Sequence, residues 1–141
     1  MTDGEEADDA SALRLAPLVI GSLVVIDLVL FLWGYGWPEL WFEVWHGAEL
    51  VDPQALLQRS AGHWLAFFLL QTVALFRHRD ERVWLALVAG ARFSDCLTDL
   101  SVLAFASSTT LAAQLLFPVA AVGNLIAGLV LLRAYRARRD S

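Results

Sequence analysis

The chain has 141 residues, of which 58% are hydrophobic and 18% are charged, and its mean hydropathy is +0.59. Soluble proteins average about 45–50% apolar and about 25% charged residues, so this composition indicates a small polytopic membrane protein. The formal net charge of −5 argues against nucleic acid as a partner, because nucleic acid requires a basic surface. The single cysteine, Cys96, excludes an internal disulfide, and the sequence contains no phosphate loop, nucleophile elbow or zinc-helix motif.

Residues 1–14 are acidic and nearly free of large apolar side chains, so we predict a disordered cytoplasmic tail. The apolar run that follows is too long for a signal peptide and lacks the basic segment that precedes one. We therefore expect a mature membrane helix over residues 15–35, interrupted only by Asp27.

Three further apolar stretches follow, and each is long enough to cross a bilayer core of about 30 Å. They predict spans over residues 60–76, 82–106 and 111–132, with a tight polar connection at 107–110. The expected fold is an all-α bundle of four transmembrane helices over residues 15–134, followed by a basic cytoplasmic tail over residues 135–141.

The distribution of arginine predicts the orientation of these spans. With a cytoplasmic N-terminus, eight arginines lie inside, whereas Arg59 alone lies outside and Arg92 is intramembrane. Both termini are therefore expected in the cytoplasm. All ten basic residues are arginine, which indicates a GC-rich genome, and we expect a bacterial cytoplasmic membrane as the location.

Residues 36–59 form the one long connection and begin with Gly36-Trp37-Pro38, a sequence that suits the start of a helix. The spacing of Trp41 and Trp45 predicts a short amphipathic helix in the outer membrane interface. Glu43 and His46 have the Glu-x-x-His spacing of carboxylate metal sites. Because only one such pair occurs, a solvated polar face is the preferred interpretation over a metal site.

The third predicted span carries Arg92, Asp95 and Asp99 on one helical face. A charge at the bilayer centre costs about 2.5–3.5 kcal/mol, so these side chains are expected to face the interior of the bundle. The helical rise of about 1.5 Å per residue places Asp27, Arg92 and Asn124 in a middle layer, with Gln71 below it.

The same estimate places His63, Asp95 and Asp99 in an outer layer, open toward Glu43 and His46. Three carboxylates oppose one arginine, which leaves a formal charge of −2. A protonated carboxyl, a charged His63 or a bound cation would each compensate it. The candidate binding residues are Asp27, His63, Arg92, Asp95, Asp99 and Asn124, and the candidate metal ligands are Glu43, His46, His63, Asp95 and Asp99.

Four spans, the outer Asp52-Pro53 and the aromatic residues Trp64, Phe67 and Phe68 resemble the sterol-isomerase-like (EXPERA) membrane domains. The resemblance implies intramembrane carboxylates in a lipid-filled cavity. Where that family has a glutamate in the second span, this chain has Gln71, one position out of step. We therefore do not transfer the family's activity.

Three hypotheses follow from the sequence. The first is a membrane binding or transport module whose acidic cavity takes a proton, a cation or a lipid headgroup. The second is an accessory subunit completed by a membrane partner or a second copy, in which Asp27 and Arg92 form a structural ion pair. The third is an enzyme that acts on a lipid or isoprenoid. The sequence identifies no cofactor, and the lipid bilayer is the one firm partner.

Overall fold

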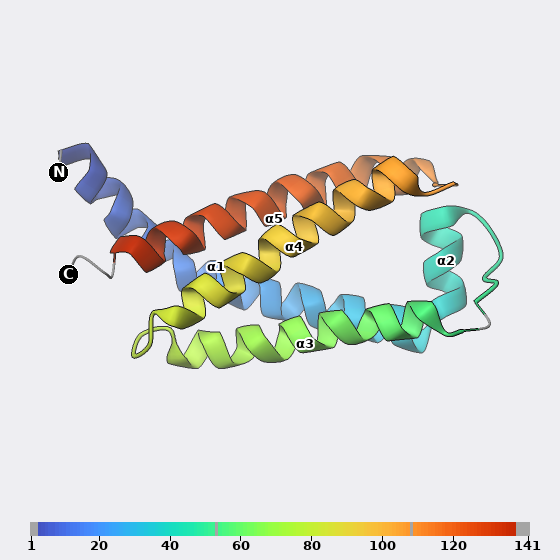
Figure 1. Ribbon diagram of the computed structural model, residues 1–141, viewed down its shortest axis with the longest axis horizontal. Coiled ribbons are helices and arrows are strands. Elements are labelled where there is room, and N and C mark those ends of the chain that lie inside the picture. The colour runs from blue at the N-terminus through green and yellow to red at the C-terminus, as the bar shows by residue number, and fades with distance from the viewer. Residues whose placement is uncertain (1–2, 53, 108, 138–141) are drawn as a thin grey trace.

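The computed structural model describes residues 3–52, 54–107 and 109–137, and in this part of the chain it contains five α-helices and no strand (Figure 1). The helices are α1 (Asp3–Gly36), α2 (Pro38–His46), α3 (Leu56–Arg77), α4 (Val83–Phe105) and α5 (Leu111–Ala137). The all-α prediction is therefore confirmed, and a helix covers each predicted segment. Two helices, α1 over Asp8–Gly36 and α5, are long and apolar enough to cross a membrane.

The first helix begins earlier than the sequence predicts, because residues 3–14 of the expected disordered tail belong to α1. Asp8 and Asp9, in the second turn of α1, pair with Arg133 of α5 at 3.2 and 2.9 Å, and these ion pairs hold the helical extension against α5. The N-terminal turns of α1 tilt away from the rest of the helix (Figure 1), and Pro17 supplies the expected cause of a bend. Residues 1–2 and 138–141 of the two predicted tails lie outside the described part of the chain.

Local signals fix the boundaries of the two helices that follow. Pro38 occupies the first turn of α2, and Gly47 ends that helix with a left-handed φ of 63°. The N-cap residue of α3 is Ala55, and the carboxylate of the preceding Asp52 satisfies the first turn of this helix, since it accepts a hydrogen bond from the Leu57 N–H at 2.8 Å. The N–H groups of Leu57 and Leu56 lower the pKa of Asp52 below its usual range.

The long helices form two pairs, α1 with α3 and α4 with α5, which pack on each other through α1–α5 and α3–α4 contacts (Figure 1). Both chain ends and the α3–α4 turn lie at one end of the bundle, which we call the terminal end. The α2 helix and the α4–α5 turn lie at the opposite end, which we call the α2 end.

Small residues allow the helices to approach closely. Much of the buried core is alanine, including Ala16, Ala74 and Ala134, which are at most 1% exposed. A Cβ added at Gly128 would lie 2.6 Å from the Phe93 ring. Helix packing through small residues is typical of membrane bundles, in which backbones approach one another closely.

Aromatic side chains close the α2 end. Trp41 of α2 is buried and packs against Trp33 of α1, Trp64 of α3 and Trp45, with ring centroids 4.8–5.6 Å apart. The α4–α5 turn is tied to α2 by Thr110, whose hydroxyl donates to the Val44 carbonyl at 2.7 Å and whose N–H donates to the Trp45 carbonyl at 3.0 Å. The helix that the sequence predicts in the long connection therefore packs on the end of the bundle.

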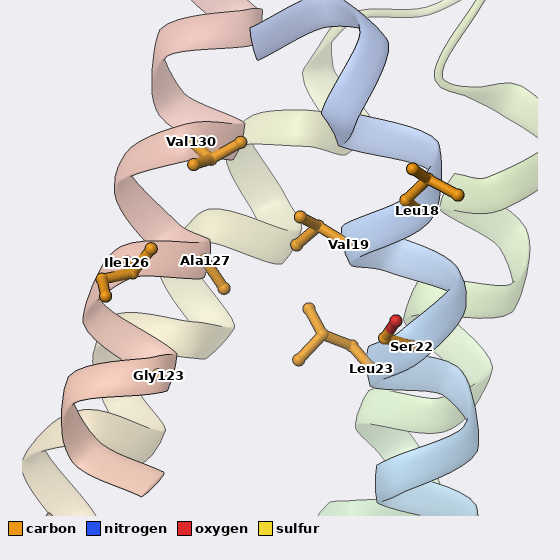
Figure 2. A pocket seen from close by; sticks show the side chains of 8 residues that line it. All are labelled: Leu18, Val19, Ser22, Leu23, Gly123, Ile126, Ala127 and Val130. Atoms are coloured by element: carbon orange, nitrogen blue, oxygen red, sulfur yellow. The ribbon is translucent and has the colours of Figure 1, made fainter. Parts of the chain in front are cut away.

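An open groove of about 330 Å³ runs between α1 and α5 on the side of the bundle (Figure 2). It is lined by Leu18, Val19, Ser22 and Leu23 from α1 and by Gly123, Ile126, Ala127 and Val130 from α5. Seven of these eight residues are apolar, so the groove offers almost no hydrogen bonds to a ligand.

Candidate functional site

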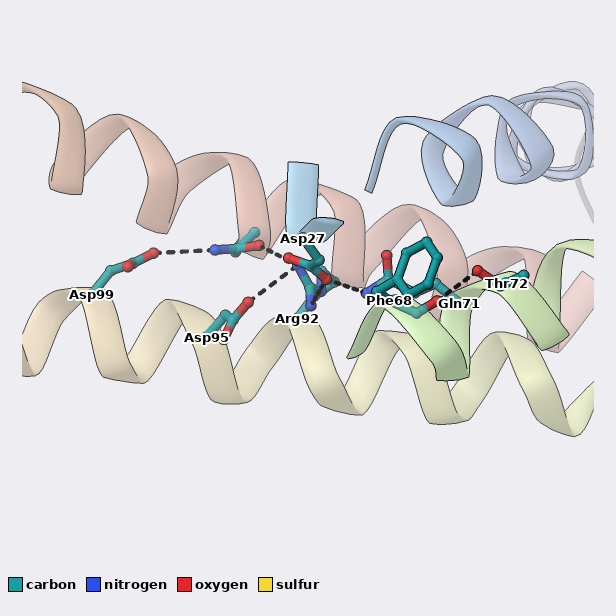
Figure 3. Close-up of polar contacts among 8 residues, drawn as sticks. Asp27, Phe68, Gln71, Thr72, Arg92, Asp95 and Asp99 are labelled. Carbon is teal, nitrogen blue, oxygen red and sulfur yellow. Dashed lines mark hydrogen bonds and ion pairs between the residues drawn. The ribbon is translucent and has the colours of Figure 1, made fainter. Parts of the chain in front are cut away.

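One buried hydrogen-bond network joins all four long helices (Figure 3). Each helix contributes one residue to its centre: Asp27 from α1, Gln71 from α3, Arg92 from α4 and Asn124 from α5. Asp27 and Gln71 are fully buried, and Arg92 is 1% exposed. Burial of this kind is rare for Asp and Arg unless they are paired, so the network governs how the helices can pack.

Asp27 accepts every hydrogen bond that it makes with the other helices. Gln71 Nε2 donates at 2.6 Å, and the Arg92 guanidinium donates at 3.0 Å through Nη2 and at 3.4 Å through Nη1. Asp27 and Arg92 form a buried ion pair, and its hydrogen bonds are of the charge-assisted kind, which is stronger than the neutral kind. This pair joins α1 to α4 and therefore connects one helix pair to the other.

Arg92 is the hub of the network. Besides Asp27 it contacts Asp95 at 3.1 Å and Asn124 Oδ1 at 3.4 Å, and its guanidinium lies 5.1 Å from the centre of the Phe67 ring. Within the described residues, Arg92 Nε and Gln71 Oε1 have no hydrogen-bond partner although both atoms are buried. The centre of the network therefore retains one unused donor and one unused acceptor.

Asp95 and Asp99 extend the network along α4 toward the α2 end. The Asp95 side chain is 17% exposed and its one ion pair is with Arg92. Asp99 is half-buried and accepts a hydrogen bond from Asn124 Nδ2 at 3.1 Å. In a formal count with every group ionised, Asp27 balances Arg92, and Asp95 and Asp99 are the two carboxylates without a second arginine in the network.

The predicted outer layer differs from the observed arrangement. His63 is exposed, and its Nδ1 lies 3.3 Å from the Ser60 carbonyl of its own helix, so it makes no bond to Asp95 or Asp99. His63 still lies close enough to Asp95 for an electrostatic interaction between the two side chains. Asn124 takes the place expected for His63, because it bonds both Asp99 and Arg92.

The candidate metal ligands are also spread apart. Glu43 is exposed on α2, and the His46 ring stacks on Phe42 with centroids 4.5 Å apart. Among the described residues, no group of three or more His, Cys, Asp or Glu side chains could hold a metal ion. The five predicted metal ligands are therefore not gathered into one site.

Gln71 is a central residue that the sequence did not select as a binding residue. Figure 3 shows it on the side of Asp27 and Arg92 opposite to Asp95 and Asp99, which agrees with the predicted position below the middle layer. Its amide donates directly to Asp27, a contact that the helical rise alone does not predict.

No family model matches the chain, and no curated protein or solved structure matches it significantly.

Proposed function

We propose that all four long helices span a membrane. The main support is the distribution of polarity, which is the reverse of that in a soluble bundle: the centre holds Asp27, Gln71 and Arg92, while large apolar side chains point outward. This holds for α3 and α4 as well as for α1 and α5. The exposed apolar residues of α3 and α4 include Leu69, Val73, Phe76, Leu87, Leu97, Leu100 and Phe105. Monomeric soluble proteins rarely expose contiguous apolar surface of this extent.

The proposed orientation places the terminal end in the cytoplasm. Both chain ends and the α3–α4 turn share this end, and with them lie Arg14, Arg77, Arg79, Arg82 and Arg133. Such an excess of arginine is typical of cytoplasmic loops. Single cysteines at Glu49 and Arg79, introduced into a Cys96→Ala background, test this topology in sealed vesicles. We expect a membrane-impermeant maleimide to label the two positions from opposite sides, and labelling from the same side would contradict the proposal.

Within this bundle we propose a binding module that takes up a proton at the Asp95–Asp99 pair. The observation that carries the proposal is the charge balance of the network: Asp27 neutralises Arg92, and two further carboxylates remain on adjacent turns of α4. A low-dielectric interior does not tolerate two uncompensated charges. A proton is the simplest compensation, because it needs no ligands beyond the carboxylate oxygens.

The two carboxylates have different neighbours in the described structure. Asp95 shares the Arg92 guanidinium with Asp27, whereas Asp99 accepts a hydrogen bond from the neutral amide of Asn124. They lie about one helical turn apart on α4, so a proton held by one carboxyl changes the charge that the other one faces. We therefore treat the pair as one proton-binding unit.

Infrared spectroscopy of the protein in lipid vesicles tests the proposal. We expect a pH-dependent carbonyl band from a protonated, sequestered carboxyl that disappears in Asp95→Asn/Asp99→Asn and persists in Glu43→Gln, which replaces an exposed carboxyl on α2. A band that persists in the double variant would overturn the assignment of the proton to this pair. A spectrum without any such band would contradict proton binding and would favour the accessory-subunit hypothesis, in which the network only holds the helix pairs together.

A further inference from the structure

The groove between α1 and α5 has a buried floor and an exposed rim. Leu23 and Ala127 form the floor, at 7% and 9% exposed, while Leu18 and Ile126 stand at the rim at 68% and 56% exposed. Figure 2 shows Val19 and Leu23 of α1 pointing across the groove toward the side of α5 that carries Ala127. The groove is therefore open along its length to whatever surrounds the bundle.

Two arginines continue the faces of the helices that line the groove. Arg14 precedes Leu18 by four residues on α1, and Arg133 follows Val130 by three residues on α5. The spacing places Arg133 on the face of α5 that lines the groove, and it places Arg14 about one turn before Leu18, on the N-terminal side of the Pro17 bend. The arginines lie about 6 Å and about 4.5 Å beyond the groove along the two helix axes, both toward the terminal end.

We propose that this groove holds an acyl chain of an anionic glycerophospholipid from the leaflet at the terminal end, with Arg14 and Arg133 binding its phosphate. The inference rests on the proposed membrane insertion but is independent of proton binding at Asp95 and Asp99. Apolar walls below a pair of guanidinium groups match the chemistry of such a lipid, because guanidinium binds phosphate through paired hydrogen bonds. A lone phosphate ion would leave the apolar groove unexplained.

A second copy of the chain fits this surface less well. Copies inserted in the same orientation would bring their basic ends into the same leaflet, so a self-complementary contact along the groove would place arginines of one copy near those of the other. An acyl chain also adapts to an open groove in which Ser22 is the one polar lining residue. The lipid is therefore the occupant that the charges favour.

Arg133 is already engaged in the structure. It pairs with Asp9 at 2.9 Å and with Asp8 at 3.2 Å, so the acidic start of α1 competes with a phosphate for the same guanidinium. Removing these carboxylates is expected to strengthen lipid binding. Loss of lipid in the arginine variants together with a selective gain of anionic lipid in the carboxylate variants would identify Arg133 as the phosphate-binding group.

Native mass spectrometry of the solubilised full chain, supplied with either dioleoyl phosphatidylglycerol or dioleoyl phosphatidylcholine, tests the inference. We expect one retained phosphatidylglycerol per chain and preference over phosphatidylcholine. Arg14→Gln with Arg133→Gln should lower its retention about tenfold or more, since each arginine adds about a kcal/mol of attraction to anionic lipid. The matched control is Arg79→Gln, an exposed arginine at the same end whose replacement should leave retention unchanged.

Two further variants separate the possible causes. Gly123→Leu fills the groove, where an added Cβ meets no atom within 4 Å, and should reduce retention with both arginines intact. Asp8→Asn with Asp9→Asn should increase it. Equal retention of the two lipids would overturn the inference. A wild-type dimer that becomes monomeric in Gly123→Leu would overturn it as well. Failure of the chain to enter vesicles at all would instead refute the proposed membrane function.

Discussion

Replacing Arg92 by methionine should destabilise the protein more than replacing Arg92 and Asp27 together. The single change leaves Asp27 as a fully buried carboxylate with Gln71 as its one remaining donor, and it removes the one ion pair of Asp95. Breaking a buried pair from one side costs about 3–5 kcal/mol, because the remaining charge is uncompensated. We therefore expect the free energy of unfolding of Arg92→Met to fall by that amount.

The double variant Arg92→Met/Asp27→Leu removes both charges of the pair. What remains is the buried Gln71 amide without its acceptor, at a cost of about 1–3 kcal/mol, while the loss of the Arg92–Asp95 ion pair is common to both variants. The double variant should consequently recover about 2 kcal/mol relative to Arg92→Met. This recovery distinguishes a charge effect from simple loss of packing volume, which would make the double variant worse.

Reversible unfolding by sodium dodecyl sulfate in mixed micelles, followed by the fluorescence of the six tryptophans, measures these differences. The control is Arg77→Met, which breaks the exposed Arg77–Glu81 pair and should shift the transition far less. The single variant Asp27→Leu completes the comparison. If the decreases in the free energy of unfolding of Arg92→Met and Asp27→Leu simply add in the double variant, Arg92 and Asp27 do not act as a pair and the reasoning fails.

Two other predictions concern packing and pH. Gly128→Ala should lower the free energy of unfolding by about 1–3 kcal/mol relative to Gly123→Ala. The added Cβ meets the Phe93 ring at 2.6 Å at position 128, whereas it meets open space at position 123. Equal stabilities of the two variants in the unfolding assay would contradict this prediction. The pKa of Asp52 is lowered in the folded chain, so its cap is fully present above the ordinary value of 3.8 and is lost as the pH falls through the folded pKa. Amide exchange at Leu57 should accelerate in this range relative to neighbouring amides, whereas Asp52→Asn should show no such pH step.

The sequence predicted the helices well because their boundaries depend on local signals. Charged and polar residues delimit each apolar run, so α4 begins at Val83 and ends at Phe105, against a predicted span of 82–106. The heights of Asp27, Arg92 and Asn124 also followed from the helical rise, and these three side chains are in contact. By length and composition, α1 and α5 of the described structure are candidate membrane-spanning helices.

The sequence did not predict which side of a helix each side chain faces or which neighbour it contacts. His63 is exposed and makes no bond to Asp95 or Asp99, whereas Gln71 bonds Asp27 directly. These outcomes depend on how each helix is rotated and tilted against its neighbours. The ion pairs of Arg133 with Asp8 and Asp9 were equally hidden, because they join residues 124 or more positions apart through a helical extension that composition predicted to be disordered.

The order of the network residues along the chain has a consequence for biosynthesis. Asp27 belongs to the first helix to be made, whereas Gln71 follows 44 residues later and Arg92 follows 65 residues later. If the helices enter the bilayer in chain order, Asp27 meets a neutral amide before it meets its counter-charge. Gln71 then acts as an interim partner, which holds α1 and α3 together while the ribosome completes the helix that carries the arginine.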